Sequence, residues 1–441
     1  MKKGIAITIT LLACCACVMA QVPSQAPPAT PGTSPPRPAT DARGPLPRVT
    51  LEDAIRLALQ HNHATLAART MVLQNEAQEI TANLRPNPVL SWDAQFLPIF
   101  QPSQFTSDYI NNQAQFDLGV GYLFERGRKR QYRLQAAKDT TQVSRWQVAE
   151  NERQLTFNVS QQFVAVLLAQ STIDFALKNL ESFQKAVEIS EIRRKDGAMS
   201  EGDLLKVKLQ LLQVQTDVST AKLAKVQAVS ALRQLMGYES VSDSFEVDGE
   251  LDYQQVNPGL DEFKAMALRS RPDLMAAQQG IVAARSQEAL AEANGKRDLG
   301  TSFNYSHVAA TNTGAFFFNI QLPIFDRNQG EIARTRVAIT QAQEQAAEAS
   351  QQVLTDVVNA FYTLRSNEEI IQLYRGGYVD QAKQSLDITE YAYRHGAASL
   401  LDFLDAERTY RSNQLAYRQA LASYMTSLEQ LREAAGTRNL P

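Results

Sequence analysis

The 441-residue chain is poor in cysteine: it has three, Cys14, Cys15 and Cys17, all near its N-terminus. If this segment is removed on export, no disulfide, thiolate metal site or cysteine nucleophile remains. The chain also lacks any block of five Lys or Arg residues, and its formal net charge is −3. Nothing therefore indicates a nucleic-acid partner. No phosphate-binding glycine loop or catalytic constellation is present, so we expect neither an enzyme nor a bound cofactor.

The first residues predict an export signal. Lys2 and Lys3 precede the apolar run "GIAITITLLACCACV", which ends in a cleavage-like pattern, so residues 1–20 are interpreted as a signal peptide. The run is too short to span a bilayer, which requires about 20 apolar residues. In an alternative, Leu11-Leu12-Ala13-Cys14 resembles a lipoprotein box, in which Cys14 would be lipidated. Both alternatives take the protein out of the cytoplasm.

Residues 21–49 are rich in proline, as in "QVPSQAPPATPGTSPPRPATDARGPLPR". Repeated proline removes backbone donors and prevents a helix or a sheet interior from forming. We therefore expect a disordered leader here rather than a domain.

Two motifs occur twice. "LEDAIRLALQHNHATLAA" begins at Leu51 and "LDEFKAMALRSRPDLMAA" at Leu260; "KDGAMSEGDLL" (195–205) is matched by "RHGAASLLDFL" (394–404). Such widely spaced copies indicate a duplicated domain rather than an array of short units. The predicted organisation is a first repeat at 50–245, a linker at 246–259 and a second repeat at 260–436.

Each repeat is expected to follow the same order of elements. Apolar residues at helical spacing predict a helix at 51–84 or 260–293, and two short strands follow. A very long helix comes next, at 128–194 or 328–394, and a glycine turn leads to a final helix at 203–236 or 402–435. A 67-residue helix is about 100 Å long. The fold class is thus mainly α with a small β part, packed like a coiled coil.

The strands show alternating apolar and polar residues. They are expected at 88–96, 113–124, 301–309 and 315–325; in the last, Phe316, Phe318, Ile320 and Leu322 share one face. Runs of about ten residues with an aromatic face are typical of transmembrane strands. Four strands cannot close a barrel, and open edges are not tolerated in lipid, so several chains must contribute, giving eight, twelve or sixteen strands. The alternative is a soluble sheet with one buried face.

The whole arrangement after residue 50 resembles the TolC-type outer membrane efflux protein family, the outer membrane factors of efflux pumps and type I secretion systems. The resemblance is carried by the duplicated order, by "RPNPVLSWD" and "LFERGRKR" around the first strand pair, and by the two glycine turns. It implies a homotrimer with a twelve-stranded outer membrane β-barrel, embedded in lipid and continued by a long periplasmic α-helical barrel. It also implies two partners: a periplasmic adaptor (membrane fusion protein) and an inner membrane pump of the RND type.

"LPIFDRNQGEIARTR" (322–336) resembles the heavy-metal (cobalt-zinc-cadmium) branch of that family. The expected function is the exit duct of a tripartite efflux pump for metal cations or small toxic molecules. Two alternatives stay open: the exit duct of a type I protein secretion system, and a periplasmic coiled-coil scaffold. His61 and His63 do not suggest a metal site, because residues two apart point to different faces of a helix.

The two turns are the candidate functional sites. Each has a glycine suited to end a helix in the left-handed conformation, followed by Ser-x-x-Asp, a capping-box pattern. The resemblance implies that the turns form periplasmic tips that dock the adaptor. The implied docking residues are Gly197, Ala198, Met199 and Ser200, and Gly396, Ala397, Ala398 and Ser399.

Asp402 and Asp405 follow the second tip and share one face of the helix. The first copy has Asp203 but Lys206 at the corresponding positions, so the acidic pair is not required by the turn. The resemblance implies that these aspartates ring a periplasmic gate, where crowding would raise their pKa values. The alternative is a pair of solvated acids.

Overall fold

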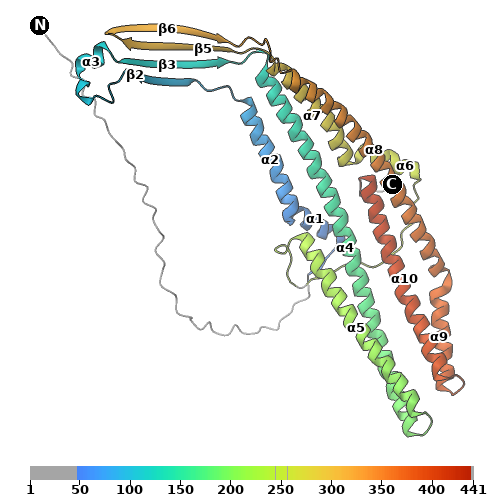
Figure 1. Cartoon of the computed structure of the whole chain (residues 1–441). Coiled ribbons are helices and arrows are strands. Elements are labelled where there is room, and N and C mark those ends of the chain that lie inside the picture. Colours follow the sequence, from blue (N-terminus) through green and yellow to red (C-terminus); the bar gives the residue numbers. More distant parts are fainter. Residues whose placement is uncertain (1–46, 244, 256, 439–441) are drawn as a thin grey trace, which may run out of the picture. The chain divides into compact units, whose positions relative to one another are not determined.

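The computed structural model describes residues 47–438 apart from residues 244 and 256 (Figure 1). The predicted signal peptide, Cys14 and the leader as far as residue 46 lie outside the described residues. Arg48 and Val49, which we assigned to the leader, instead form the short strand β1 (Arg48–Val49), parallel to β4 (Glu246–Val247). The leader is therefore predicted two residues too long, because this strand depends on a distant partner.

The described elements repeat in the predicted order. The first copy contains α1 (Leu51–His61), α2 (His63–Asn83), β2 (Val89–Gln95), the loop elements η1 (Pro102–Gln104) and α3 (Ser107–Asn112), β3 (Gln115–Phe124), α4 (Lys129–Lys195) and α5 (Glu201–Met236). The second contains α6 (Leu260–Ser270), α7 (Pro272–Asn294), β5 (Leu299–Val308), β6 (Thr311–Ile320), α8 (Gln329–Leu373), η2 (Tyr374–Tyr378), α9 (Val379–Arg394) and α10 (Leu400–Ala435). The predicted fold class, mainly α with a small β part and a duplicated unit, is confirmed.

The predicted single helices at 51–84 and 260–293 are each broken into two. Asn62 ends α1 and begins α2, because its side chain accepts the N–H groups of Ala64 and Thr65 at 3.0 and 3.2 Å. In the second copy Pro272 opens α7, and the residue before a proline is disfavoured in helical conformation. Both breaks lie at the same place in the repeat.

The predicted long helix of the first copy is continuous as α4, but that of the second is interrupted. η2 is a π-helical segment with the sequence "YRGGY", in which Gly377 has a φ of 108°. Glycine adopts this conformation without steric cost, whereas other residues rarely do. The glycine pair therefore separates α8 from α9, which the apolar spacing alone did not indicate.

The four longer strands form one antiparallel sheet in the order β2-β3-β5-β6. The register places Leu90, Val120, Phe303 and Phe316 in one row across the sheet and Ser91, Gly119, Asn304 and Ala315 in the next. The apolar and polar faces predicted from alternation are therefore continuous. The last strand is displaced from the predicted 315–325: it begins at Thr311 and ends at Ile320, so Leu322 lies beyond it.

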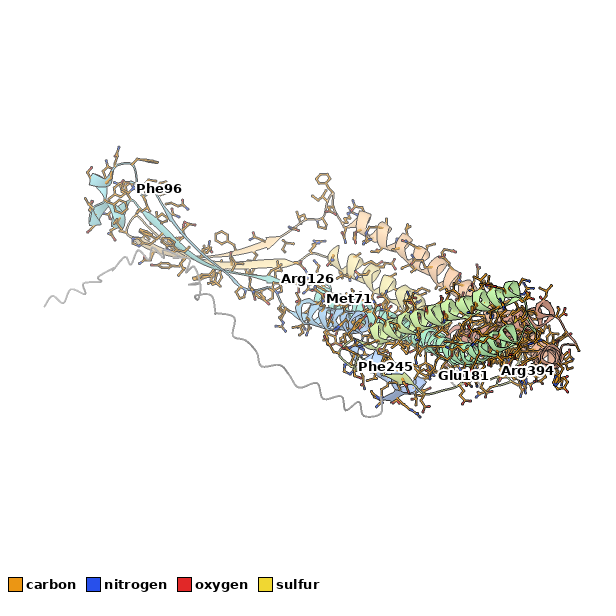
Figure 2. The ribbon with its side chains drawn as sticks, turned by 90° about the horizontal axis from the view of Figure 1, so that it is seen from below. Met71, Phe96, Arg126, Glu181, Phe245 and Arg394 are labelled. Atoms are coloured by element: carbon orange, nitrogen blue, oxygen red, sulfur yellow. The ribbon has the colours of Figure 1, made fainter. Side chains whose placement is uncertain are left out.

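The sheet and the helices meet at a polar junction that joins the two copies. Lys129, at the start of α4, forms an ion pair with Asp298, before β5, at 2.7 Å, and the same carboxylate accepts the N–H of Arg126 at 3.0 Å. Figure 2 shows Arg126 at this junction and Phe96 at the far end of the sheet. The motif "LFERGRKR" thus turns the chain from the second strand into the long helix.

Two apolar clusters hold the middle of the helical part. In the first copy Ile55, Val159, Phe163, Leu232 and Met236 are buried together. In the second, the corresponding buried cluster includes Phe263, Val357, Leu364, Tyr424 and Leu431. Apolar burial of this kind stabilises by about 25 cal/mol per Å², so the short helices α1 and α6 are fixed by their packing on α4 and α8.

A buried arginine fixes the break before α7. Arg271 is 3% exposed; its Nε and Nη2 bond Asp273 at 3.0 and 2.5 Å, and its Nη1 bonds Asp356 of α8 at 2.8 Å. Burial alone would raise the pKa of Asp273, but the hydrogen bond and charge of Arg271 outweigh it and lower that pKa. Asp273 therefore contributes stability above its ordinary pKa, and this is lost as the pH falls through its folded value.

Arg271→Met should destabilise the helical part by about 3 kcal/mol, the low end for removing one partner of a buried ion pair, because both aspartates stay partly exposed. The measurement is thermal loss of the far-ultraviolet circular dichroism signal. Arg269→Met, at an exposed site of α6, is the matched control and should leave the midpoint unchanged. Equal midpoints for the two variants would contradict the structural role of Arg271.

Candidate functional site

The two glycine turns end helical hairpins, α4 with α5 and α9 with α10. Both lie at the end of the helices remote from the sheet, and Figure 2 labels Arg394 there. Gly197 and Gly396 have φ values of 74° and 78°, the left-handed conformation predicted for them. At neither position would an added Cβ meet an atom within 4 Å. The space around both glycines is open.

The same hydrogen-bond pattern closes α4 and α9. Gly197 N–H donates to the Arg194 carbonyl at 3.2 Å and Ala198 N–H to that of Arg193 at 2.8 Å. At the second turn Gly396 N–H bonds the Tyr393 carbonyl at 3.2 Å and Ala397 N–H that of Ala392 at 2.8 Å. This is the Schellman pattern that a left-handed glycine permits, so each glycine is required by the local fold.

The helices after the turns begin at serine caps. The Ser399 side chain accepts Asp402 N–H at 3.2 Å, and the Asp402 carboxylate accepts Ser399 N–H at 3.1 Å, which completes the predicted capping box. At the first turn Ser200 accepts Asp203 N–H at 3.0 Å, but the Asp203 carboxylate bonds the Ser200 hydroxyl instead, at 2.8 Å. The second turn is therefore the more closely fixed.

Six of the eight predicted docking residues are exposed: Gly197, Ala198, Ser200, Gly396, Ala397 and Ser399. Ala398 is partly buried. Met199 is also partly buried, because its side chain packs against a cluster formed by Val207, Leu400 and Phe403. Met199 thus helps to join the two hairpins, and the exposed surface of each turn is mainly small residues and backbone.

Further contacts hold the two tips together. Arg193 of α4 donates through Nη1 to the Tyr393 carbonyl at 3.3 Å, and its guanidinium lies 4.9 Å from the centre of the Tyr393 ring. Within the second hairpin, the Tyr393 ring of α9 stacks on the Phe403 ring of α10, with ring centres 5.3 Å apart. Arg193 could not be identified from the sequence, because its partner lies in the other repeat.

Asp402 and Asp405 are both exposed on α10, as their spacing predicted. Hydrogen bonds from the Ser399 side chain and backbone lower the pKa of Asp402, so within one chain this carboxylate stays charged at neutral pH. This direction is opposite to the rise expected from crowding in an assembled ring. Asp405 forms an ion pair with Arg408 at 2.5 Å, a cation that the sequence analysis missed although it lies three residues away. Water screens such an exposed pair, so Arg408 binds weakly.

The sheet presents the second candidate site. Along its apolar face Trp92, Phe316 and Phe318 are 67%, 75% and 70% exposed. A patch of large exposed side chains that runs across all four strands marks a surface that contacts lipid or another protein. Among the described residues no group of three or more His, Cys, Asp or Glu could hold a metal ion, and His61 and His63 are both exposed.

Comparison with known proteins finds one family whose model covers most of both repeats. Residues 54–238 and 265–437 match the model of the family described as outer membrane efflux protein. The cobalt-zinc-cadmium resistance protein CzcC of Cupriavidus metallidurans is 25% identical over 406 residues, which cover 90% of each chain. The cation efflux system protein CusC of Escherichia coli is 25% identical over 273 residues, 58% of each chain.

Solved structures share the fold. The crystal structure of CusC has a TM-score of 0.70 at 18% identity, and the match covers 88% of this chain and 92% of that one. A membrane protein of Pseudomonas aeruginosa gives a TM-score of 0.73 at 18% identity, covering 89% and 91% of the two chains.

Proposed function

The chain belongs to the outer membrane efflux protein family, and from this premise we propose that it is the outer membrane exit duct of a tripartite pump for metal cations. It lies in the outer membrane with a long periplasmic helical part. The family is one of transport proteins rather than enzymes, and we infer that this chain conducts its cargo without catalysis. Energy for transport comes from an inner membrane pump of the RND type, through a periplasmic adaptor.

The observation that carries the proposal is the exposed apolar face of a sheet with two open edges. β2 and β6 are the outer strands of the sheet, and each has one side that pairs with no strand among the described residues. In lipid these backbone groups require partners. Three chains with four strands each would close a twelve-stranded barrel with its apolar face outward. A soluble scaffold would leave the same aromatic face in water, which disfavours that alternative.

The names of the relatives support metal cations as cargo. CzcC is a cobalt-zinc-cadmium resistance protein and CusC belongs to a cation efflux system. The stretch 322–336, just after β6, carries the same resemblance. A duct needs a wide passage for its cargo rather than a ligand cluster, so we assign the metal specificity to the pump and the adaptor.

Deleting the gene should lower the concentration of zinc, cobalt or cadmium that stops growth, because the exit route is lost. Growth in graded metal checks this, and a plasmid copy should restore resistance. Sensitivity to detergents or dyes without any change in metal tolerance would contradict the metal assignment and leave the duct assignment standing.

The tips are proposed as the adaptor-docking surface. Their small exposed residues let a partner backbone approach closely, and the geometry occurs twice in each chain, so a trimer would present six tips. Because nothing lies within 4 Å of a Cβ at Gly197 or Gly396, a larger side chain there would project into the surface that the adaptor is to occupy.

Gly396→Val should abolish resistance while the protein still reaches the outer membrane. The strain of a left-handed non-glycine residue is about 1–2 kcal/mol, too little to unfold the helical part, so the loss is expected from docking. Resistance and crosslinking to the adaptor are measured together, also for Gly197→Val. Gly280→Val, in a helix with open space around it, is the control. Undiminished crosslinking in both tip variants would refute docking at the tips.

Asp402 and Asp405 are proposed to ring the gate at the periplasmic end. With Arg408 beside Asp405, each chain contributes a net charge of −1 from these three residues, rather than the −2 expected from sequence. A ring of such charges favours cations over anions. Arg408 moderates this preference without reversing it.

Asp402→Asn/Asp405→Asn should reduce cation selectivity in planar bilayers, and block by multivalent cations added on the periplasmic side should weaken. Asparagine is chosen because its side-chain oxygen at position 402 can still accept the Ser399 N–H of the capping box. Arg408→Gln should change selectivity in the opposite direction, and Asp203→Asn at the first turn is the control. If the double variant keeps the selectivity and block of the wild type, the two aspartates do not line the entrance.

A further inference from the structure

A cavity of about 360 Å³ lies between the two hairpins, on the sheet side of the tips. Its walls come from α4, α5, α9 and α10, so it exists only where the two repeats pack together. Four aromatic rings line it, those of Phe183, Tyr393, Phe403 and Tyr410. The volume lies within the range of pockets that hold small organic molecules, about 300–1,000 Å³.

One carboxylate in this cavity forms no ion pair with the described residues. Glu407 of α10 lines the cavity and is only 4% exposed, and neither of its carboxylate oxygens accepts a well-formed hydrogen bond, although the Asn179 amide is close enough to lower its pKa. An unpaired buried charge is costly. Burial raises the pKa of Glu407, the charge of Arg411 and the amide of Asn179 oppose the rise, and the charge of Asp217 adds to it. Nothing in the proposed docking or gating uses this residue.

The cations near Glu407 are paired with other acids. Lys185 of α4 bonds Glu181 at 2.7 Å, Lys383 of α9 bonds Asp387 at 3.3 Å, and Arg394 of α9 bonds Glu390. Arg411, on the same helix as Glu407, bonds Asp217 of α5 at 3.3 Å. Among the described residues, Glu407 therefore has no counter-ion of its own: Arg411, the cation that acts on it, is already paired with Asp217.

The lining chemistry determines which counter-ion fits. The cavity has no His, Cys or Met among its lining residues, which disfavours soft metal ions. A hard divalent ion needs several oxygen ligands. Glu407 is the one carboxylate among the lining residues without an ion-pair partner, so the cavity offers such an ion too few ligands. Aromatic rings beside a carboxylate are suited to a cation that carries apolar groups, because such a cation gains from both cation–π contact and apolar burial.

We propose that this cavity binds an organic monocation, an ammonium whose charge pairs with Glu407 and whose apolar groups contact the four rings. Because the ligand would contact both hairpins, its binding stabilises their packed arrangement over any separated one. The site is distinct from the path of the metal cargo, and its occupation does not depend on which substrate the duct conducts.

The test is calorimetric titration of the full-length protein in non-ionic detergent with benzyltrimethylammonium, whose charge does not change with pH. The wild type should bind, and Glu407→Gln should bind at least about tenfold more weakly. Glu188→Gln, an exposed acid of α4 outside the cavity, is the matched control and should bind as the wild type does. Affinity should also fall as the pH is lowered through the pKa of Glu407, because the protonated group has no charge to pair.

A second variant tests binding in a protein that keeps Glu407, so the result does not depend on whether Glu407→Gln folds normally. Ser182→Trp, at an exposed lining position of α4, fills the cavity without changing Glu407 and should abolish binding. Failure of the wild type to bind the probe, or equal affinity in wild type, Glu407→Gln and Ser182→Trp, would overturn the proposal. Displacement of the probe by stoichiometric zinc would also overturn it and indicate a metal site instead.

Discussion

The unpaired edges of the four-stranded sheet are the constraint on which the rest of the structure depends. Each edge strand has backbone donors and acceptors that water could satisfy but lipid cannot. We propose that the exposed aromatic face lies in lipid and that the edges pair with strands of other chains, so that several chains share one barrel. The open sheet thus makes assembly part of the fold of each chain.

The internal duplication of the chain determines the structure of its periplasmic end. Each repeat contributes two strands to the sheet and one helical hairpin, whose turn lies at the end of the helices remote from the sheet. A left-handed glycine and a serine cap end one helix and begin the next within a few residues, so the turn stays narrow. The two hairpins are then joined by Arg193 on Tyr393 and by the apolar cluster around Phe403. The cavity lined by Glu407 lies between these contacts and the middle of the helices.

Local patterns predicted most of the fold. The alternation in 113–124 and the apolar spacing in α4 depend on near neighbours, and both elements occur as expected. Gly197, Gly396 and the Ser399–Asp402 capping box were also predictable, because turn chemistry is local. The helix breaks at Asn62 and before Pro272 have local signals, a capping asparagine and a proline. The prediction of single helices followed the apolar periodicity and disregarded these signals, as it disregarded the glycine pair before Tyr378. Arg193, the burial of Met199 and the unpaired Glu407 were not predictable, since each depends on contacts between the two repeats.

The most direct test of the account is the mass of the detergent-solubilised protein, measured by light scattering during size-exclusion chromatography and corrected for bound detergent. Closure of the open sheet predicts a complex of several chains, and the family resemblance predicts that there are three. This complex should persist on dilution. A stable monomer that remains dispersed without detergent would contradict the account, because the edges of β2 and β6 and the aromatic face would then need neither partner strands nor lipid.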